Sequence, residues 1–535
     1  MIKNIKLIIS LILVLVICFS GCIQNADIDE NDNADNNSNN NHNNETKIKP
    51  DKIYVDDDFN MNSSGWKIDH FDNIEEGIEN VSESGTVYIS NGEYFENLLI
   101  NKSIKIIGED KEKTIINGNR NGNVISISNP SCSIEKINIS NSGSNSGIKI
   151  YSNNNNISNI VFYNNYYGVW IDRKTQNSVT NNVFFGNDIA IKLSGASDSK
   201  VSNNKIYSNK LEGIYLETCI RITIRNNYFE NGGIYITGPM TSWNSHIIEE
   251  NYVNDKPIKY LVNENGATVP SDSAQLIIVD SRNIDIENID FENIVIGVQL
   301  THCSKITIND NNFQSIDKNS IIAYFCDNIT IENNNIDSGN GITVLNSENN
   351  IITKNTISNT ETAIDIDNSK NNIISLNSIS NNKNGIYSKQ GMENEISENV
   401  IFKNSDYGIY LLTNSNYNNV NDNNLYENKI TIRIKGSRNN DVYFNNLKDS
   451  LEKAVYICCG ATQNAIYNNS FINNKRDVDF TILSENYFYK NGYGNYWDDY
   501  IEKYPNANQI NGIWDTPYDI PETNTKDEFP LVNRI

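Results

Sequence analysis

The residues of this chain best placed for acid–base chemistry are Asp365, Asp367 and Lys389. The two carboxylates are two residues apart, so on a β-strand they point to the same face with their Cα atoms about 6.6 Å apart. Such a pair could act in glycoside cleavage as acid and base, or could hold Ca²⁺. The alternative is a set of solvated surface charges, which is common in an acidic chain.

Aromatic residues recur at one position of a short repeated phrase, which reads small residue, apolar, any, apolar, as in Gly213-Ile-Tyr-Leu. The third residue of the phrase points outward from a strand whose other face is buried. Six of fifteen such positions are Trp or Tyr: Trp170, Tyr215, Tyr235, Tyr387, Tyr410 and Tyr456. Flat rings with polar tips suit sugar rings and their hydroxyls, which makes these residues candidate glycan-binding groups. The alternative is that they only shield the sheet and pack along it.

The phrase recurs from Gly147 to Asp477 at steps of 20 to 23 residues, with one double step of 42 between Gly233 and Gln275. A fixed period of this length is typical of a solenoid. The alternation of apolar residues predicts strands, and each repeat is too short to add a helix. Because parallel crossovers are overwhelmingly right-handed, we expect an all-β, right-handed parallel β-helix of about fifteen or sixteen coils, capped at both ends.

Asparagine pairs such as Asn181-Asn182 and Asn445-Asn446 recur in phase with the coils. Asn tolerates left-handed backbone at corners, and stacked Asn side chains can form hydrogen-bonded ladders. Cys303 and Cys326 each lie six residues after the first residue of a phrase, on neighbouring coils. Stacking brings them within disulfide range, although two buried free thiols are an equal alternative.

The N-terminus has the layout of a secretion signal. Two lysines precede an apolar run, and Ser20-Gly21-Cys22 follows it. Residues 1–22 therefore resemble a signal peptide with a lipobox-like end, in which Cys22 would carry the lipid. An uncleaved anchor or plain secretion is the alternative. Each of these places the body outside the cytoplasm, lipid-anchored at the membrane or secreted.

The rest of the chain divides by composition. Residues 23–51 are rich in Asn and Asp and too poor in apolar residues to fold, so we expect a disordered tether. We expect an N-terminal cap with irregular first coils over 52–122, β-helix repeats over 123–490 and a C-terminal cap over 491–535. The chain has 67 acidic and 43 basic residues, a net charge of −24, which disfavours nucleic acid and anionic lipid as partners. Acidic polysaccharides would need a local basic patch or bridging Ca²⁺.

Two segments carry a family resemblance. Thr86-Val-Tyr-Ile-Ser-Asn-Gly-Glu-Tyr94 resembles the start of pectin-lyase-fold proteins. Gly494-Asn-Tyr-Trp-Asp-Asp-Tyr500 and Asp527-Glu-Phe-Pro-Leu531 resemble the end of NosD-family β-helix domains of archaeal cell surfaces. The resemblance implies a periplasmic copper-binding accessory protein for the maturation of nitrous oxide reductase.

Copper favours clustered His, Met or Cys, whereas the chain has four His and one adjacent His-Cys pair, His302-Cys303. We therefore predict no dedicated cofactor or metal site; Ca²⁺ could bind, and copper is implied by the resemblance alone. The sequence favours a protein that binds polysaccharide or a surface glycan, or forms part of the surface coat. The alternatives are a polysaccharide lyase or glycoside hydrolase, and a copper-binding accessory protein.

Overall fold

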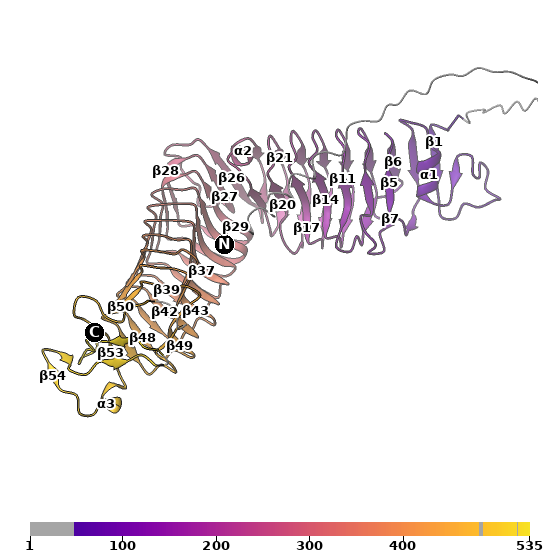
Figure 1. Cartoon of the computed structure of the whole chain (residues 1–535). Coiled ribbons are helices and arrows are strands. Elements are labelled where there is room, and N and C mark those ends of the chain that lie inside the picture. The colour runs from indigo at the N-terminus through magenta and orange to yellow at the C-terminus, as the bar shows by residue number, and fades with distance from the viewer. Residues whose placement is uncertain (1–47, 481–484, 522) are drawn as a thin grey trace, which may run out of the picture. The chain divides into compact units, whose positions relative to one another are not determined.

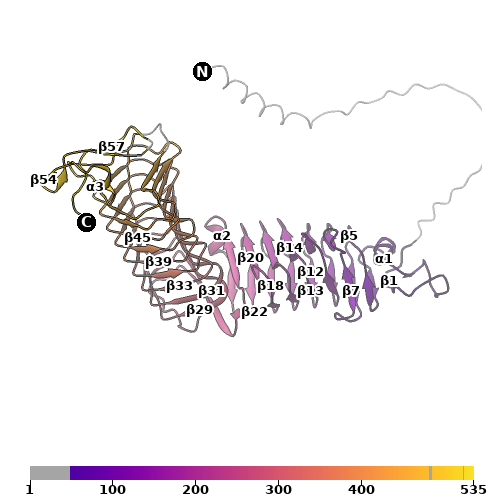
Figure 2. The same cartoon turned by 90° about the horizontal axis from the view of Figure 1, so that it is seen from below.

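The computed structural model describes residues 48–480, 485–521 and 523–535. Residues Lys49–Ile535 form one compact unit, a parallel β-solenoid of about 18 turns (Figures 1 and 2). The predicted β-helix is therefore confirmed, although the expected fifteen or sixteen coils were too few because the first coils lack the repeated phrase. The signal segment, Cys22 and most of the tether lie outside the described residues. No helix in the described ranges has the length and apolar composition needed to span a bilayer.

The repeated phrase forms two stacks of parallel strands, which we call the first and second front sheets. The first consists of β5 (Leu98–Ile100), β8 (Ile125–Ile127), β11 (Ser146–Ile150), β14 (Tyr167–Asp172), β17 (Ile189–Ser194), β20 (Ile214–Glu217) and β23 (Ile234–Thr237). The second consists of β27 (Gln275–Val279), β29 (Asp290–Thr301), β31 (Asn312–Tyr324), β34 (Asn340–Leu345), β37 (Thr362–Asp367), β40 (Asn384–Lys389), β43 (Tyr407–Leu412), β46 (Ile430–Lys435), β49 (Lys453–Cys458) and β52 (Val478–Phe480).

Further sheets close each coil behind the front sheets. One ten-stranded sheet runs from β2 (His70–Phe71) and β1 (Lys52–Val55) to β24 (Ile247–Glu249), and a nine-stranded sheet runs from β28 (Arg282–Glu287) to β50 (Ala465–Tyr467). Inward side chains, mostly Ile and Val, fill the space between the sheets and are fully buried. Aromatic residues stack inside as well, for example Phe162 on Phe184 with ring centroids 4.7 Å apart.

The long step in the sequence is where the first front sheet ends. After β23 come the short helix α2 (Thr241–Asn244) and β25 (Tyr252–Val253), which pairs antiparallel with β26 (Lys256–Val262). β26 then pairs parallel with β27, so the double step contains one further coil that lacks the repeated phrase and is entered through an antiparallel turn. The outer edge of β23 is covered by two glutamines. Gln275 accepts a hydrogen bond from the Ile234 N–H at 3.0 Å, and Gln299 donates one to the Ile234 carbonyl at 2.9 Å.

One residue of each Asn pair is buried and belongs to a ladder. In Asn181-Asn182 it is the second: Asn182 donates from its backbone and side-chain nitrogens to Asn204 Oδ1 at 3.0 and 3.2 Å, while Asn181 supplies left-handed backbone at the corner with φ of 58°. In Asn423-Asn424 it is the first, and the preceding Asp422 supplies the left-handed backbone with φ of 54°. Because these ladders satisfy backbone groups inside the corners, the Asn periodicity is structural.

Both ends of the solenoid are covered. At the N-terminal end, α1 (Ile74–Asn80) has Asn73 as its N-cap, and it packs against β1 and β5. At the C-terminal end, Trp497 stacks between Phe471 and Tyr518, with centroid distances of 4.3 Å on each side. The third helix, α3 (Tyr500–Lys503), lies in this cap.

Candidate functional site

The outward residues of the repeated phrase lie side by side, as their spacing predicts. Lys149, Trp170, Lys192, Tyr215 and Tyr235 pair in register across the first front sheet. Asp365, Tyr387, Tyr410, Arg433, Tyr456 and Asp479 do so across the second. The six predicted aromatic residues thus form two groups of three, the first group on the first front sheet and the second group on the second.

The strip that these residues would form is interrupted and only partly exposed. At the start of the second front sheet, the outward residues Ile277 and Gln299 are both 0 % exposed, and the Gln299 side chain is hydrogen-bonded to β23. Of the six aromatic side chains, Tyr410 is 6 % exposed and the others are half-buried. A long ligand could therefore contact the edges and hydroxyls of these rings more readily than their full faces.

In the first group, cations lie over the rings. The Lys149 ammonium is 3.5 Å from the Trp170 ring centroid, and Tyr215 stacks on Tyr235 with centroids 5.2 Å apart. Lys149 and Lys192 also pair with Asp172 and Glu217, at 4.0 and 3.2 Å. These contacts fix the orientation of the rings and neutralise the local charge.

A pocket of about 450 Å³ lies where the two front sheets meet. Its lining includes Tyr235 of β23, on the first front sheet, and Asp365 of β37, on the second. Its other lining side chains include Trp243, Asn319, Ile322, Tyr324 and Thr343. Sequence reasoning missed Trp243, Asn319 and Tyr324. Tyr324 could have been found, because it lies two residues after the outward Ile322, whereas Trp243 lies in the long step and carries no repeat signal.

The predicted trio of charged residues is only partly a unit. Asp367 and Lys389 are in register on β37 and β40, and their side chains form an ion pair at 3.6 Å. Asp365 instead lines the pocket, with a buried Oδ1 atom that has no hydrogen-bond partner. Burial, reinforced by the charge of Asp367, raises the pKa of Asp365 to about 6. A carboxyl group with this pKa can exchange a proton near neutral pH.

Three residues of the outward strip carry a buried polar atom without a hydrogen-bond partner. There are nine such side-chain atoms in the described ranges, and three belong to strip residues: Trp170 Nε1, Asp365 Oδ1 and Arg433 Nε. Native proteins satisfy nearly all buried polar groups, so each exception requires an explanation. Here two donors and one acceptor occupy the same position of the repeat.

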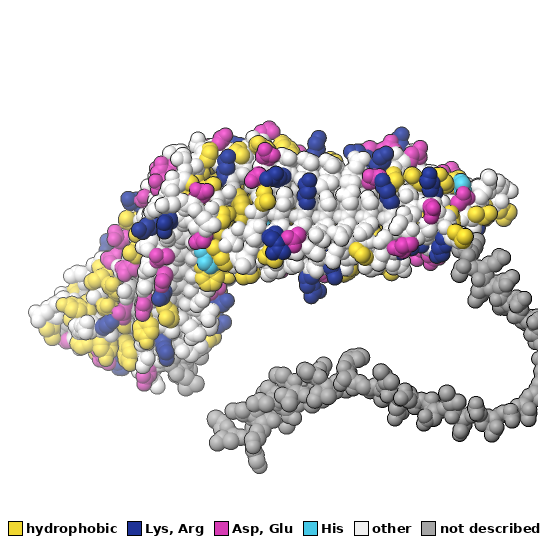
Figure 3. Space-filling model, turned by 90° about the horizontal axis from the view of Figure 1, so that it is seen from above, with side chains coloured by type: hydrophobic (Ala, Val, Ile, Leu, Met, Phe, Trp, Pro, Cys, Tyr) yellow, Lys and Arg dark blue, Asp and Glu magenta, His cyan; other side chains and the backbone are white. Residues whose placement is uncertain are grey.

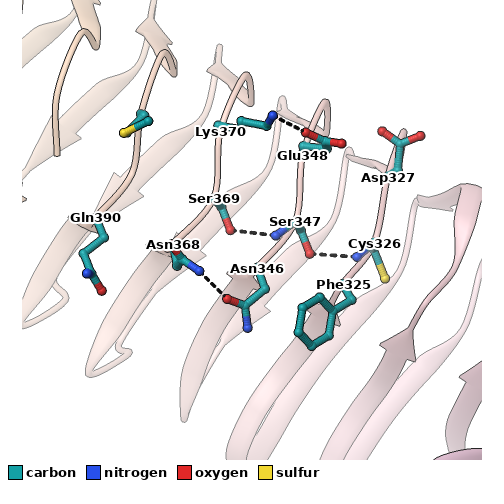
Figure 4. Close-up of a pocket in the computed structure, with 11 residues that line it drawn as sticks. Phe325, Cys326, Asp327, Asn346, Ser347, Glu348, Asn368, Ser369, Lys370 and Gln390 are labelled. Atoms are coloured by element: carbon teal, nitrogen blue, oxygen red, sulfur yellow. Dashed lines mark hydrogen bonds and ion pairs between the residues drawn. The ribbon is translucent and has the colours of Figure 1, made fainter. Parts of the chain in front are cut away.

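Cys326, Ser347 and Ser369 occupy equivalent buried positions of successive coils. The backbone N–H of Cys326 donates to Ser347 Oγ at 2.9 Å, and that of Ser347 donates to Ser369 Oγ at 3.0 Å (Figure 4). The surface pocket beside them is lined by turn residues and an ion pair between Lys370 and Glu348 at 2.9 Å. Cys303 and Cys326 are buried free thiols in the structure, so the bridge that the sequence allows is not formed there.

The thiol state can be counted. We expect the native protein to react through Cys459, which is the exposed cysteine of the described ranges, and to gain five reactive thiols on denaturation. These five are the buried Cys132, Cys219, Cys303, Cys326 and Cys458. Titration with a thiol reagent before and after adding denaturant, without reductant, measures the difference. A gain of three would mean that Cys303 and Cys326 are bridged.

Two family models match the sequence. A model described as right handed beta helix region matches residues 114–280, and one described as periplasmic copper-binding protein (NosD) matches 244–405 and 340–501. With the parallel coils, these matches define a right-handed parallel β-helix protein. Over residues 244–501 the chain is similar to the NosD family. No curated protein matches the sequence.

Several solved structures show a distant likeness. A pectin methylesterase is 13 % identical, with 47 % of this chain and 79 % of that chain covered and a TM-score of 0.28. The DFA-IIIase of Arthrobacter chlorophenolicus A6 is 11 % identical, with 60 % and 83 % covered and a TM-score of 0.32. The periplasmic alginate epimerase AlgG is 12 % identical, with 76 % and 77 % covered and a TM-score of 0.28. At these TM-scores the likeness does not bear on the function of this chain.

The donor set does not fit copper. In the part of the chain that the structure describes, the one group of three His, Cys, Asp or Glu ligand atoms within 4.8 Å of one another is Asp477, Asp498 and Asp499. Carboxylates suit Mg²⁺, Ca²⁺ or Mn²⁺ better than copper. Lys503 already pairs with Asp499 at 2.7 Å, and Asn474 donates to Asp477 at 3.0 Å. No step of a mechanism is therefore assigned to copper.

Proposed function

We propose that this chain is an extracytoplasmic β-helix protein that binds polysaccharide along its front sheets, at the cell surface or in the surface coat. The observation that carries the proposal is the pair of in-register aromatic groups on the two front sheets, with the pocket between Tyr235 and Asp365 where the sheets meet. Sugars offer both ring faces and many hydroxyls, which suit aromatic rings and phenol hydroxyls. The pocket between Tyr235 and Asp365 would hold one sugar unit.

The location follows from two separate arguments. The periplasmic description of the NosD model supports an extracytoplasmic site. The lipobox-like Ser20-Gly21-Cys22 would attach the body to the membrane through a lipid on Cys22. On the face shown in Figure 3, acidic and basic side chains are interspersed, which suits a protein that remains soluble close to a charged surface.

The test is binding of the full chain to a panel of polysaccharides, with and without Ca²⁺. Tyr235→Ala and Tyr387→Ala, one from each aromatic group, are each expected to weaken binding about tenfold. The reason is that a buried ring contact contributes roughly 1–3 kcal/mol to the binding free energy. Tyr228→Ala is the matched control, because Tyr228 is an exposed tyrosine of β22 (Tyr228–Glu230), outside the front sheets. Equal affinity in all four proteins would contradict the proposal.

The raised pKa of Asp365 favours one alternative, a polysaccharide lyase or glycoside hydrolase. The same samples distinguish it when new reducing ends and unsaturated products are measured. Under the binding proposal no product forms. Product that appears with the native chain and is lost with Asp365→Asn would instead make Asp365 a catalytic residue, with Asp367 and Lys389 as its paired neighbours.

A further inference from the structure

Arg433 lies in a cage of tyrosine rings on the second front sheet. It is in register between Tyr410 on β43 and Tyr456 on β49. Its guanidinium carbon is 4.9 Å from the Tyr410 ring centroid, 5.1 Å from that of Tyr456 and 5.2 Å from that of Tyr407. Three rings therefore orient one half-buried cation.

This cation has no carboxylate partner. The strands of the front sheets carry seven cations: Lys149, Lys192, Lys318, Lys389, Arg433, Lys435 and Lys453. Five of them pair with a carboxylate within 4.0 Å, and in the described ranges Arg433 and Lys435 do not. Arg433 donates to the Tyr407 hydroxyl and to Cys458 Sγ, the latter at 3.8 Å, while its buried Nε donates to no protein atom.

The groups around Arg433 do not supply the missing negative charge. Burial raises the pKa of Tyr410 to about 12, and burial raises the pKa of Cys458 above its usual value despite the nearby guanidinium. Both groups are therefore neutral at pH 7. A half-buried cation among neutral partners is costly unless an anion joins it. In a chain with a net charge of −24, a cation left in this state is unusual.

We propose that Arg433 is a subsite for the carboxylate or sulfate group of an acidic polysaccharide. A planar guanidinium can donate two parallel hydrogen bonds to such a group, which an ammonium cannot. Lys435 lies two residues along β46, on the same side of the strand, and adds a second unpaired cation. The inference rests on the proposed polysaccharide binding and narrows it to anionic chains.

The test compares the full chain with Arg433→Gln and with Arg438→Gln, which removes the same charge from an exposed residue outside the strand. The probes are polygalacturonate for carboxylate, dextran sulfate for sulfate, and the best-bound neutral glycan of the panel. We expect Arg433→Gln to weaken binding of at least one acidic polymer tenfold or more, with neutral binding unchanged. Arg438→Gln should remain within twofold of the native chain, and the polymer affected identifies the anionic group.

Each other outcome decides against the subsite. Equal losses in the two variants would mean general charge attraction and would overturn it. Neutral glycan bound as tightly as the acidic polymers would overturn the subsite and leave the proposed function standing, whereas no glycan binding would remove both. If Arg433→Gln lowers the melting temperature, Arg433→Lys carries the test, since it keeps the charge without the planar fork. Arg433→Lys should bind the acidic polymer three- to tenfold more weakly than the native chain, and an unchanged affinity would overturn the subsite.

Discussion

Replacing Asn423 by Ala is expected to lower the free energy of unfolding of the surrounding coils by about 3–5 kcal/mol, because one buried N–H loses its partner and four other buried groups each lose a hydrogen bond. Asn423 Oδ1 accepts from the backbone N–H and the side-chain amide of Asn399, at 2.9 and 3.0 Å. Its own amide donates to Ile396 O and Asn421 O, both at 2.8 Å, and to Asn445 Oδ1 at 2.9 Å. Alanine leaves the buried Asn399 N–H without a partner. The other groups each lose one hydrogen bond, although Asn421 O keeps the Glu398 N–H and Asn445 Oδ1 keeps the backbone N–H of residue 423.

The adjacent Asn424 provides the control. Its side chain is exposed and accepts one hydrogen bond, from the Asn446 amide at 3.0 Å. Asn424→Ala should therefore change stability by less than about 1 kcal/mol. Hydrogen exchange of the coils on either side, together with urea unfolding, measures both variants, since a solenoid need not unfold as a single unit. Similar losses in the two variants would refute a stabilising role for the ladder.

The sequence predicts the period and the register of the front sheets because both follow from local patterning. Apolar alternation fixes which side chains of a strand point inward, and the constant step stacks equivalent residues. For this reason Asp367 and Lys389 are neighbours, as expected. The phrase failed to identify the first coils, where β5 and β8 lack its small first residue, so the coil count was too low.

The sequence does not predict which outward residues become covered. Ile277 and Gln299 occupy outward positions of the repeat, yet both are fully buried beside β23. Gln299 is hydrogen-bonded to Ile234 of β23, 65 residues away in the sequence, so its burial is set by tertiary packing. The pocket arises at the same place, which is why Trp243 and Asn319 could not be assigned to it from the repeat. The period fixes each sheet, and the junction between sheets forms the candidate site.

Asp527→Asn is expected to loosen the C-terminal cap and to change how its stability depends on pH. Asp527 Oδ2 accepts hydrogen bonds from the Asn495 N–H at 2.6 Å and from Trp497 Nε1 at 2.9 Å, while Oδ1 accepts from the Phe529 N–H at 3.0 Å. The carboxyl group thus ends the ladder that passes through Asn469 and Asn495. An amide has one acceptor oxygen, so at least one buried donor loses its partner, at a cost of about 1–3 kcal/mol.

Burial raises the pKa of Asp527 to about 7, above the value near 3.8 of an unfolded chain. Because the folded-state pKa is the higher one, the stabilisation is fully present below about pH 4 and is lost as the pH rises through 7. The native cap should therefore open more readily at pH 8 than at pH 5. The free energy of opening should fall by up to about 1.4 kcal/mol for each pH unit between the unfolded and the folded pKa. Asp477, whose pKa burial also raises to about 7, adds to this trend. Hydrogen exchange of residues 494–531 should show that Asp527→Asn is less protected than the native chain at pH 5 and that its protection depends less on pH. If protection changes with pH as steeply in the variant as in the native chain, Asp527 is not the source of the pH dependence.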